Sequence, residues 1–350
     1  MRLLDTATVQ LKEFVGNGIP PYAILSHTWE DDEVSLQALP TAGHIAPEPA
    51  GYTKIKKCCE QAASDGFQYV WIDTCCIDKT NSAKLSEAIN SMYRWYWDAV
   101  ECYAYLADVS LADLSLADFG KRFKGSRWFK RGWTLQELIA PRFVVFFDSR
   151  WIEIGTKASL RKEITAITGI PEQVLSTRRF SEYSIAQTMS WASKRQTSRV
   201  EDIAYSLLGL FDVNMPMIYG EGSKAFLRLQ HEIMRKSSDQ SLFAWNTSPF
   251  DHYCAHGSGP LAPSPFEFRG CGHIVRSQVN EQSEYSLTNR GLRITLPLLR
   301  EINREGAAPA VLEYTSSQDI VYGATVIIGL LDCFRPDGTR IGIYLTQVRP

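Results

Sequence analysis

The first 155 residues alternate between strand-like and helix-like segments, and this alternation constrains the fold more than any other feature of the sequence. Short apolar runs indicate buried strands, and apolar residues repeated every three or four positions indicate helices. The segments that read as strands are 21–29, 67–73, 101–109 and 142–151, and those that read as helices are 52–66, 84–99 and 133–140. Strands joined by helices form a parallel sheet that helices cover on both faces. We therefore expect an α/β domain over residues 1–155.

The rest of the chain changes character twice. Residues 156–245 carry helical spacing almost throughout, with Gly, Asn and Pro between the segments. Residues 246–350 consist of short β-branched or alternating runs divided by Gly, Pro and Asp turns, which is typical of strands. The sequence thus predicts a helical extension over 156–245 and a β-rich C-terminal domain over 246–350.

The composition excludes several classes of protein. Of the 350 residues, 45% are hydrophobic and 22% are charged, as in ordinary globular proteins. A net charge of −2 with scattered Lys and Arg argues against a nucleic-acid partner, and no apolar run is long enough to span a membrane. Asp5 and Gln10 interrupt any secretory signal. Eight cysteines without a CxxC pair predict neither a zinc site nor a disulfide framework. We expect a cytoplasmic protein.

Polar and aromatic side chains follow each predicted strand. Ligands of open parallel sheets bind beyond the carboxyl ends of the strands, so these positions define the candidate site. The first strand ends in Ser26, His27 and Trp29, and the second ends in Asp73. The third leads through a loop to a segment that contains Arg131, Trp133 and Glu137.

Glu137 raises the question of its role. It shares one face of a short predicted helix with Trp133, whereas Leu135, Leu138 and Ile139 share the other. We expect the aliphatic face to enter the core and Glu137 to lie outside it, beside the indole. The simpler alternative is that Glu137 is a surface residue next to a half-buried tryptophan. His27 and Asp73 likewise have a simpler alternative, in which they form hydrogen bonds that hold loops and do not bind a substrate.

Three segments resemble the signature blocks of the fungal heterokaryon incompatibility (HET) domain. They are residues 22–29 (YAILSHTW), 69–79 (YVWIDTCCIDK) and 126–138 (SRWFKRGWTLQEL). The resemblance covers about residues 20–150, and residues 199–233 and 239–245 also resemble the extension found behind many HET domains. Small departures occur at His27, Glu30, Asp78 and Lys79, where the family more often has Tyr, Gly, Asn and Gln.

HET domains are in turn similar to TIR domains. Trp133, Thr134, Glu137 and Leu138 fall on the TIR motif W-C-x-x-E-L, with Thr134 in place of Cys. In TIR enzymes that cleave NAD, the Glu of this motif is catalytic. The resemblance therefore implies a TIR-like (flavodoxin-like) sheet and a catalytic Glu137. We expect Ser26, His27, Trp29, Asp73, Arg131 and Trp133 to bind the substrate, on grounds of position and chemistry.

The resemblance implies an NAD glycohydrolase that triggers fungal incompatibility and immune cell death. It needs no metal and no cofactor, because NAD is the substrate, and its partners are further copies of the chain and an upstream NLR-like sensor. Two alternatives stay open. The chain could be a non-catalytic adaptor that acts by assembly, or, on weaker grounds, a metal-dependent phosphohydrolase or nuclease that uses Asp73, Asp78 and Glu137.

Overall fold

The computed structural model describes residues 1–16, 18–40, 51–111, 116–245, 260–277, 285–289, 291–301 and 326–345. The chain divides into two compact units. The first unit comprises Met1–Arg179, Arg195–Thr197 and Tyr205–Met217, and the second comprises Phe180–Lys194, Ser198–Ala204 and Ile218–Pro350. The first unit contains the sheet and every predicted site residue.

Between β3 and β6 the strands and helices alternate as the sequence predicts. The strands are β1 (Arg2–Asp5), β2 (Leu11–Glu13), β3 (Ala23–His27), β4 (Tyr69–Trp71), β5 (Glu101–Tyr105), β6 (Val144–Phe147) and β7 (Glu153–Thr156). The helices are α1 (Tyr52–Ser64), α2 (Asp73–Cys76), α3 (Ser82–Asp98), α4 (Leu116–Gly125), α5 (Thr134–Ile139), α6 (Arg161–Thr168) and α7 (Glu172–Thr177), with short 3₁₀ turns η1 (Leu36–Ala38) and η2 (Arg127–Lys130).

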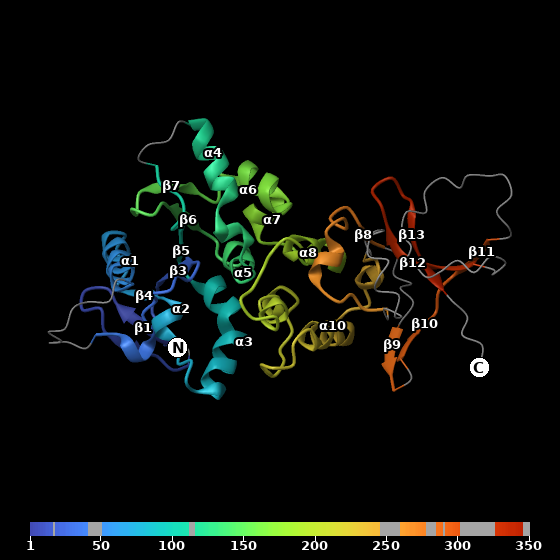
Figure 1. Cartoon of the computed structure of the whole chain (residues 1–350), viewed down its shortest axis with the longest axis horizontal. Coiled ribbons are helices and arrows are strands. Elements are labelled where there is room, and N and C mark those ends of the chain that lie inside the picture. The colour runs from blue at the N-terminus through green and yellow to red at the C-terminus, as the bar shows by residue number, and fades with distance from the viewer. Residues whose placement is uncertain are drawn as a thin grey trace. The chain divides into compact units, whose positions relative to one another are not determined.

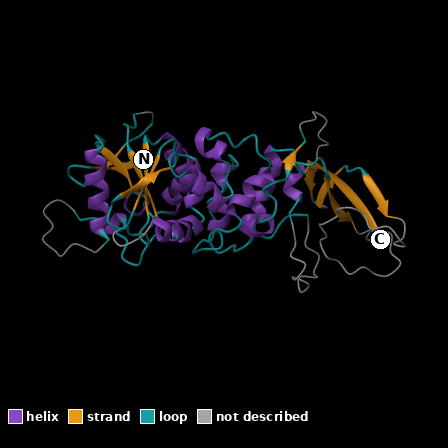
Figure 2. Ribbon diagram, turned by 90° about the horizontal axis from the view of Figure 1, so that it is seen from above, coloured by secondary structure: helices purple, strands orange, loops and turns teal. Residues whose placement is uncertain are grey.

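The sheet of the first unit has the order β2-β1-β4-β3-β5-β6-β7. Its four central strands, β4, β3, β5 and β6, are parallel, and every residue of β3 and β4 is buried, as expected for strands covered on both faces. Helix α1 lies against one face of this sheet, and α3 and α5 lie against the other (Figures 1 and 2). The expected class, a largely parallel sheet flanked by helices, is confirmed.

Both edges of the sheet differ from the expectation of a purely parallel sheet. Strands β1 and β2 form an antiparallel hairpin, and β1 pairs antiparallel with β4. At the other edge β7 runs antiparallel to β6 after a tight turn in which Trp151 has a φ of 61°. Connections this short can join only antiparallel strands. The sequence analysis assigned no strand to residues 1–20 or 152–156, because these strands have only three or four residues, which is too few for a clear pattern.

The remaining elements follow residue 180. The helices are α8 (Ile185–Ala192), α9 (Asp202–Tyr205) and α10 (Lys224–Lys236), with 3₁₀ turns η3 (Leu208–Leu210), η4 (Gln240–Phe243) and η5 (Pro265–Phe268). The strands are β8 (Val275–Arg276), β9 (Tyr285–Thr288), β10 (Gly291–Ile294), β11 (Leu298–Glu301), β12 (Val326–Phe334) and β13 (Arg340–Leu345).

The C-terminal part is rich in strands, as the sequence predicts. Strand β12 pairs antiparallel with β11, β13 and β8, and β9 and β10 form a separate hairpin. Parts of the predicted domain 246–350, namely 246–259, 278–284, 290, 302–325 and 346–350, lie outside the described residues.

Two properties of the described residues bear on the composition argument. No helix in these ranges combines the length and the apolar character that a membrane crossing requires. All seven cysteines that the structure describes are free and buried; Cys254 lies outside the described residues.

Candidate functional site at the carboxyl ends of the parallel strands

The order of the central strands places the expected ligand position between β3 and β5. Strand β3, the first of the four in the chain, has the second strand, β4, on one side and the third, β5, on the other. Chain connections therefore leave β3 and β5 in opposite directions, which opens a crevice at their carboxyl ends in sheets of this kind. Ser26 and His27 are the last two residues of β3.

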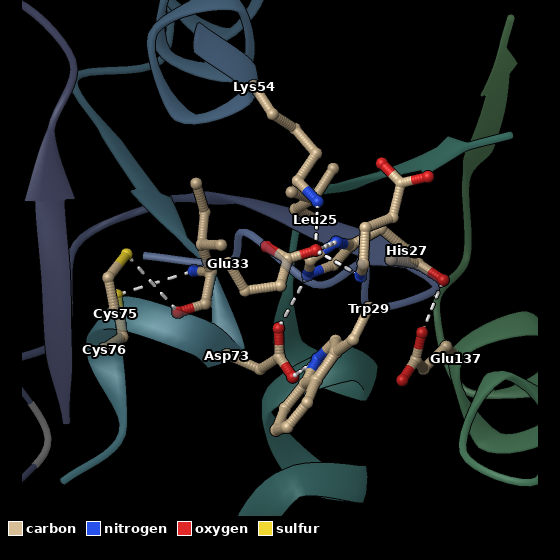
Figure 3. Close-up of polar contacts among 12 residues, drawn as sticks. Leu25, His27, Trp29, Glu33, Lys54, Asp73, Cys75, Cys76 and Glu137 are labelled. Atoms are coloured by element: carbon tan, nitrogen blue, oxygen red, sulfur yellow. Dashed lines mark hydrogen bonds and ion pairs between the residues drawn. The ribbon is translucent and has the colours of Figure 1, made fainter. Parts of the chain in front are cut away.

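Glu137 lies at this position and is buried, with 6% of its surface exposed. Ser26 donates a hydrogen bond from its Oγ to Oε2 of Glu137 at 2.5 Å (Figure 3). The indole Nε1 of Trp128 donates to the same Ser26 Oγ at 2.8 Å. A buried Trp–Ser–Glu chain thus connects η2, β3 and α5.

The burial of Glu137 corrects the expectation that it would lie outside the core. Every residue of α5 is buried, because this helix packs against β3, α3, α7 and η2 at once. An amphipathic pattern identifies the most apolar face of a helix, but it does not say how many other faces neighbouring elements will cover.

The surroundings of Glu137 place its ionisation near neutral pH. Burial raises the pKa of Glu137 to about 8, against the opposing effect of the hydrogen bond from Ser26. The negative charge of Asp73 raises the pKa further, and the positive charges of Arg195 and Arg131 lower it. A group with this pKa exchanges its proton in the range where enzymes use carboxyl groups as acids, bases or charge stabilisers.

A second group of side chains surrounds Asp73 at the start of α2. His27 Nε2 lies 2.9 Å from Oδ1 of Asp73, and Trp29 donates from Nε1 to Oδ2 at 2.7 Å (Figure 3). The Nζ atom of Lys79 lies 3.5 Å from the centre of the Trp29 ring. Burial alone would raise the pKa of Asp73, but the hydrogen bonds from His27 and Trp29 and the positive charges of His27 and Lys79 lower it to about 2.

His27 has a carboxylate on each side of its ring. Its Nδ1 atom lies 3.5 Å from Oε1 of Glu33, and Lys54 forms an ion pair with that same oxygen. Glu33 belongs to the acidic run after Trp29, whose simplest interpretation is a solvated loop, yet its side chain is only 12% exposed. The pair of Glu33 and Lys54 anchors this loop to α1.

Arg131 and Trp133 lie on the segment that leads into α5. Trp133 is half-buried and is the residue before the first turn of the helix. The structure therefore brings the predicted residues together in two groups, Ser26 with Glu137, and His27 and Trp29 with Asp73, while the charge of Arg131 acts on Glu137.

Arg195 is a site residue that the sequence analysis did not identify. It is 6% exposed, and its Nη1 donates to the Arg131 carbonyl and to the Thr134 hydroxyl, both at 2.8 Å. Its segment runs beside Gly132, whose N–H donates to the Gln196 carbonyl at 2.8 Å. A Cβ atom at Gly132 would lie 2.5 Å from a methyl group of Thr197. A glycine at position 132 is compatible with close packing of another segment, but the sequence does not show that this segment is 195–197.

The alternative of a metal-dependent enzyme requires carboxylates that converge on one point. They contain no group of three or more His, Cys, Asp or Glu side chains that could hold a metal ion. Asp78 accepts hydrogen bonds from the Thr80 hydroxyl at 2.7 Å and from Gln37 Nε2 at 3.1 Å, and these described contacts do not link it to Asp73 or Glu137.

Comparison with known proteins bears on the first unit above all. Residues 22–119 match the family model of the heterokaryon incompatibility protein (HET). The chain is thus similar to HET proteins over this range. Over 241 residues the chain is 49% identical to the vegetative incompatibility protein HET-E-1 of Podospora anserina. The aligned residues make up 67% of this chain but only 18% of that protein. Residues 224–258 match a domain of unknown function (DUF8212), and no solved structure matches.

The range that matches the HET model contains only some of the candidate site residues. Ser26, His27, Trp29 and Asp73 lie inside residues 22–119, whereas Trp128, Glu137 and Arg195 lie beyond that range. The comparisons confirm the resemblance to HET proteins that the three motifs indicate. The further similarity to TIR domains stays a prediction.

Proposed function

We propose that this chain is an effector of heterokaryon incompatibility whose HET domain cleaves the bond between nicotinamide and ribose in NAD, with Glu137 as the catalytic carboxylate. The incompatibility role is supported by the HET match and by the similarity to a protein named for vegetative incompatibility. The observation that carries the chemistry is the burial of Glu137 at the carboxyl end of β3, where Ser26 holds it by a hydrogen bond.

The chemistry suits a single buried carboxylate. Cleavage of a glycosidic bond passes through a state with the character of an oxocarbenium ion. A fixed negative charge beside the ribose stabilises that cation, and it does so more strongly in a site of low dielectric. Nicotinamide leaves as a neutral molecule, so the leaving group needs no proton. The bound nicotinamide ring is itself cationic, and a nearby positive charge lowers the pKa of a carboxyl group and favours its ionised form.

The remaining residues have roles in substrate binding in this proposal. Trp29 is 45% exposed, and its indole is fixed by Asp73 and Lys79, so it offers an aromatic surface for a base to stack on. His27, held by Asp73, binds a ribose hydroxyl, and Arg131 forms an ion pair with the pyrophosphate. Self-association of the chain controls the activity.

The test measures NAD loss and nicotinamide release by the purified chain at low and high protein concentration, with a chelator present. Glu137→Gln keeps the shape of the side chain and removes its charge. Glu163→Gln on α6 is the matched control, because Glu163 is exposed. We expect turnover by the wild type and the control, and a loss of about a hundred-fold or more in Glu137→Gln, the size of effect that one electrostatic contact in a transition state provides.

Two results would contradict the proposal. Turnover that survives in Glu137→Gln would show that another group stabilises the transition state. No turnover at any concentration, together with cell killing by Glu137→Gln on expression in a fungus, would leave the adaptor that acts by assembly.

A further inference from the structure

We propose that Trp128 is a positioning residue of this site: its indole N–H fixes the Ser26 hydroxyl as the hydrogen-bond donor to Glu137. The inference deepens the proposed function and rests on it for the role of Glu137. Trp128 carries no charge, and it acts on Glu137 only through Ser26.

The direction of the hydrogen bonds follows from the chemistry of the three groups. An indole N–H can donate but cannot accept, whereas a serine hydroxyl can do both. Because Trp128 Nε1 donates to Ser26 Oγ at 2.8 Å, the Ser26 hydrogen cannot point at the indole, and Oε2 of Glu137 is the acceptor that it reaches. Without the indole, the hydroxyl hydrogen is free to turn away from Glu137, and the hydrogen bond that it donates to the carboxylate is weakened.

Burial makes this constraint effective. Ser26 and Trp128 are both fully buried, so water does not compete for these hydrogen bonds, and each bond in such a chain polarises the next. A hydrogen bond donated to the charged form of a carboxyl group favours that form. The ionised form is the one that stabilises a cationic transition state.

Trp128 is itself held rigidly by its surroundings. Its ring packs edge-to-face on Phe129 and Phe146, with centroids 5.1 Å and 5.5 Å away. Its carbonyl accepts a hydrogen bond from Thr134 Oγ1 at 2.5 Å, which links the position of the indole to the first turn of α5. The turn that carries Trp128 is anchored by Asp108, which accepts from the Ser126 hydroxyl at 2.7 Å.

Other charged and titratable groups also act on Glu137 and remain constant in the test. They are Asp73 on α2, Tyr96 on α3, Cys102 on β5, Arg131 before α5, and Arg195. A change in the titration of Glu137 that follows the removal of one indole N–H, with these groups intact, therefore reports on the Trp128–Ser26 link.

The first experiment titrates Glu137 directly, by NMR of carboxyl-labelled glutamate, in the wild type, Trp128→Phe, Ser26→Ala and the double variant. The spectrum of Glu137→Gln assigns the signal. We expect the midpoint of Glu137 to rise by about half a unit to one unit in Trp128→Phe. It should also rise in Ser26→Ala, and Trp128→Phe should add nothing once Ser26 is absent. Trp191→Phe, which removes another buried indole N–H in the second unit, should leave the midpoint unchanged.

A midpoint of Glu137 that stays constant in a folded Trp128→Phe chain would overturn the inference, as would equal shifts in the presence and absence of Ser26. If Trp128→Phe does not fold, the indole signals of the wild type decide. One indole N–H should titrate together with Glu137 and should stop doing so in both Ser26→Ala and Glu137→Gln. If no indole N–H signal titrates together with Glu137, the inference is overturned as well.

The second experiment follows turnover, if the wild type cleaves NAD. The acidic limb of kcat/KM against pH should move upward in Trp128→Phe, with a loss of about three- to ten-fold near pH 7 that is recovered above the limb. A purely structural role of Trp128 would lower the rate equally at every pH and would contradict the inference. An inactive wild type would contradict the proposed function, while the titration would still decide the role of Trp128.

Discussion

Two carboxyl groups of the site have pKa values that move in opposite directions. Burial raises the pKa of Glu137 to about 8, with one opposing hydrogen bond from Ser26. Asp73 is held near 2 because His27, Trp29 and Lys79 outweigh its burial. Such a difference between neighbouring carboxyl groups separates a residue that changes its proton from one that keeps its charge. At the scale of single residues, Asp73 therefore keeps its charge and holds its neighbours, whereas Glu137 is the group that changes its proton near neutral pH.

The pKa of Glu137 predicts how stability depends on pH. Because the folded pKa lies above the usual 4.5, the stabilising effect of the protonated group is fully present below about pH 4.5 and is lost as the pH rises towards 8. The Glu137→Gln variant lacks this loss. The wild type should therefore lose stability relative to the variant by up to about 1.4 kcal/mol per pH unit across this range. Urea unfolding of both chains between about pH 5 and pH 9 measures the difference, and parallel curves would show that Glu137 ionises normally.

Helix α5 illustrates what holds an element of this size. It has six residues, which is too short for a stable helix in water. Its first turn is held by Arg195 and by the bond from Thr134 to Trp128. At its other end Lys157 donates from Nζ to the carbonyls of Leu138 and Pro141. The position of Glu137 therefore depends on groups outside its own helix.

Removal of the Lys157 contacts should destabilise the first unit. Lys157→Met leaves two buried carbonyl groups without a donor, at a cost of about 1–3 kcal/mol after the relief of burying a cation. Lys162→Met on α6 is the control, since Lys162 is exposed. Urea midpoints of the two variants give the comparison. Equal midpoints would mean that the packing of α5, and not its end, determines its stability.

At the scale of the whole molecule, the first unit is discontinuous in sequence. The predicted domain ends at residue 155, but the unit also contains Lys157, the segment Arg195–Thr197 and the segment Tyr205–Met217. In the last of these, η3 packs against α3 so closely that a Cβ atom at Gly209 would lie 2.0 Å from the Tyr93 side chain.

A pair of fragments tests this organisation. A fragment 1–155 lacks the groups that hold both ends of α5 and the partner of α3, whereas a fragment 1–217 keeps them. We expect the Tm of 1–155 to lie at least about 10 °C below that of 1–217, since each kcal/mol corresponds to a few degrees in units of this size. Thermal melting followed by circular dichroism decides. Equal Tm values would show that residues 1–155 are independent of the later segments.

The proposed self-association can be tested on the whole chain. If neighbouring copies complete the site, the turnover of NAD per chain should rise with protein concentration, in step with the mass measured by light scattering. Glu137→Gln should assemble to the same extent without turnover. A turnover per chain that is independent of concentration would show that a single copy is sufficient.

The sequence by itself determined the class of fold and the neighbourhood of the site. Periodicity located the central strands and the helices between them, and the three motifs indicated the similarity to HET domains. Because parallel strands end at one edge, positions such as Ser26, Asp73 and Glu137 could be assigned to a common rim. Strands β1, β2 and β7 were not predicted, since each has only three or four residues, which is too few for a clear pattern.

Only the tertiary structure decided how the site residues are used. The bond between Ser26 and Glu137 joins residues 111 positions apart, and that between Trp128 and Ser26 spans 102 positions. Arg195 reaches Thr134 across 61 positions. A periodic pattern shows which residues share a face, but it carries no information on what covers the other faces. The burial of Glu137, and with it the raised pKa, is therefore a property of the packed molecule.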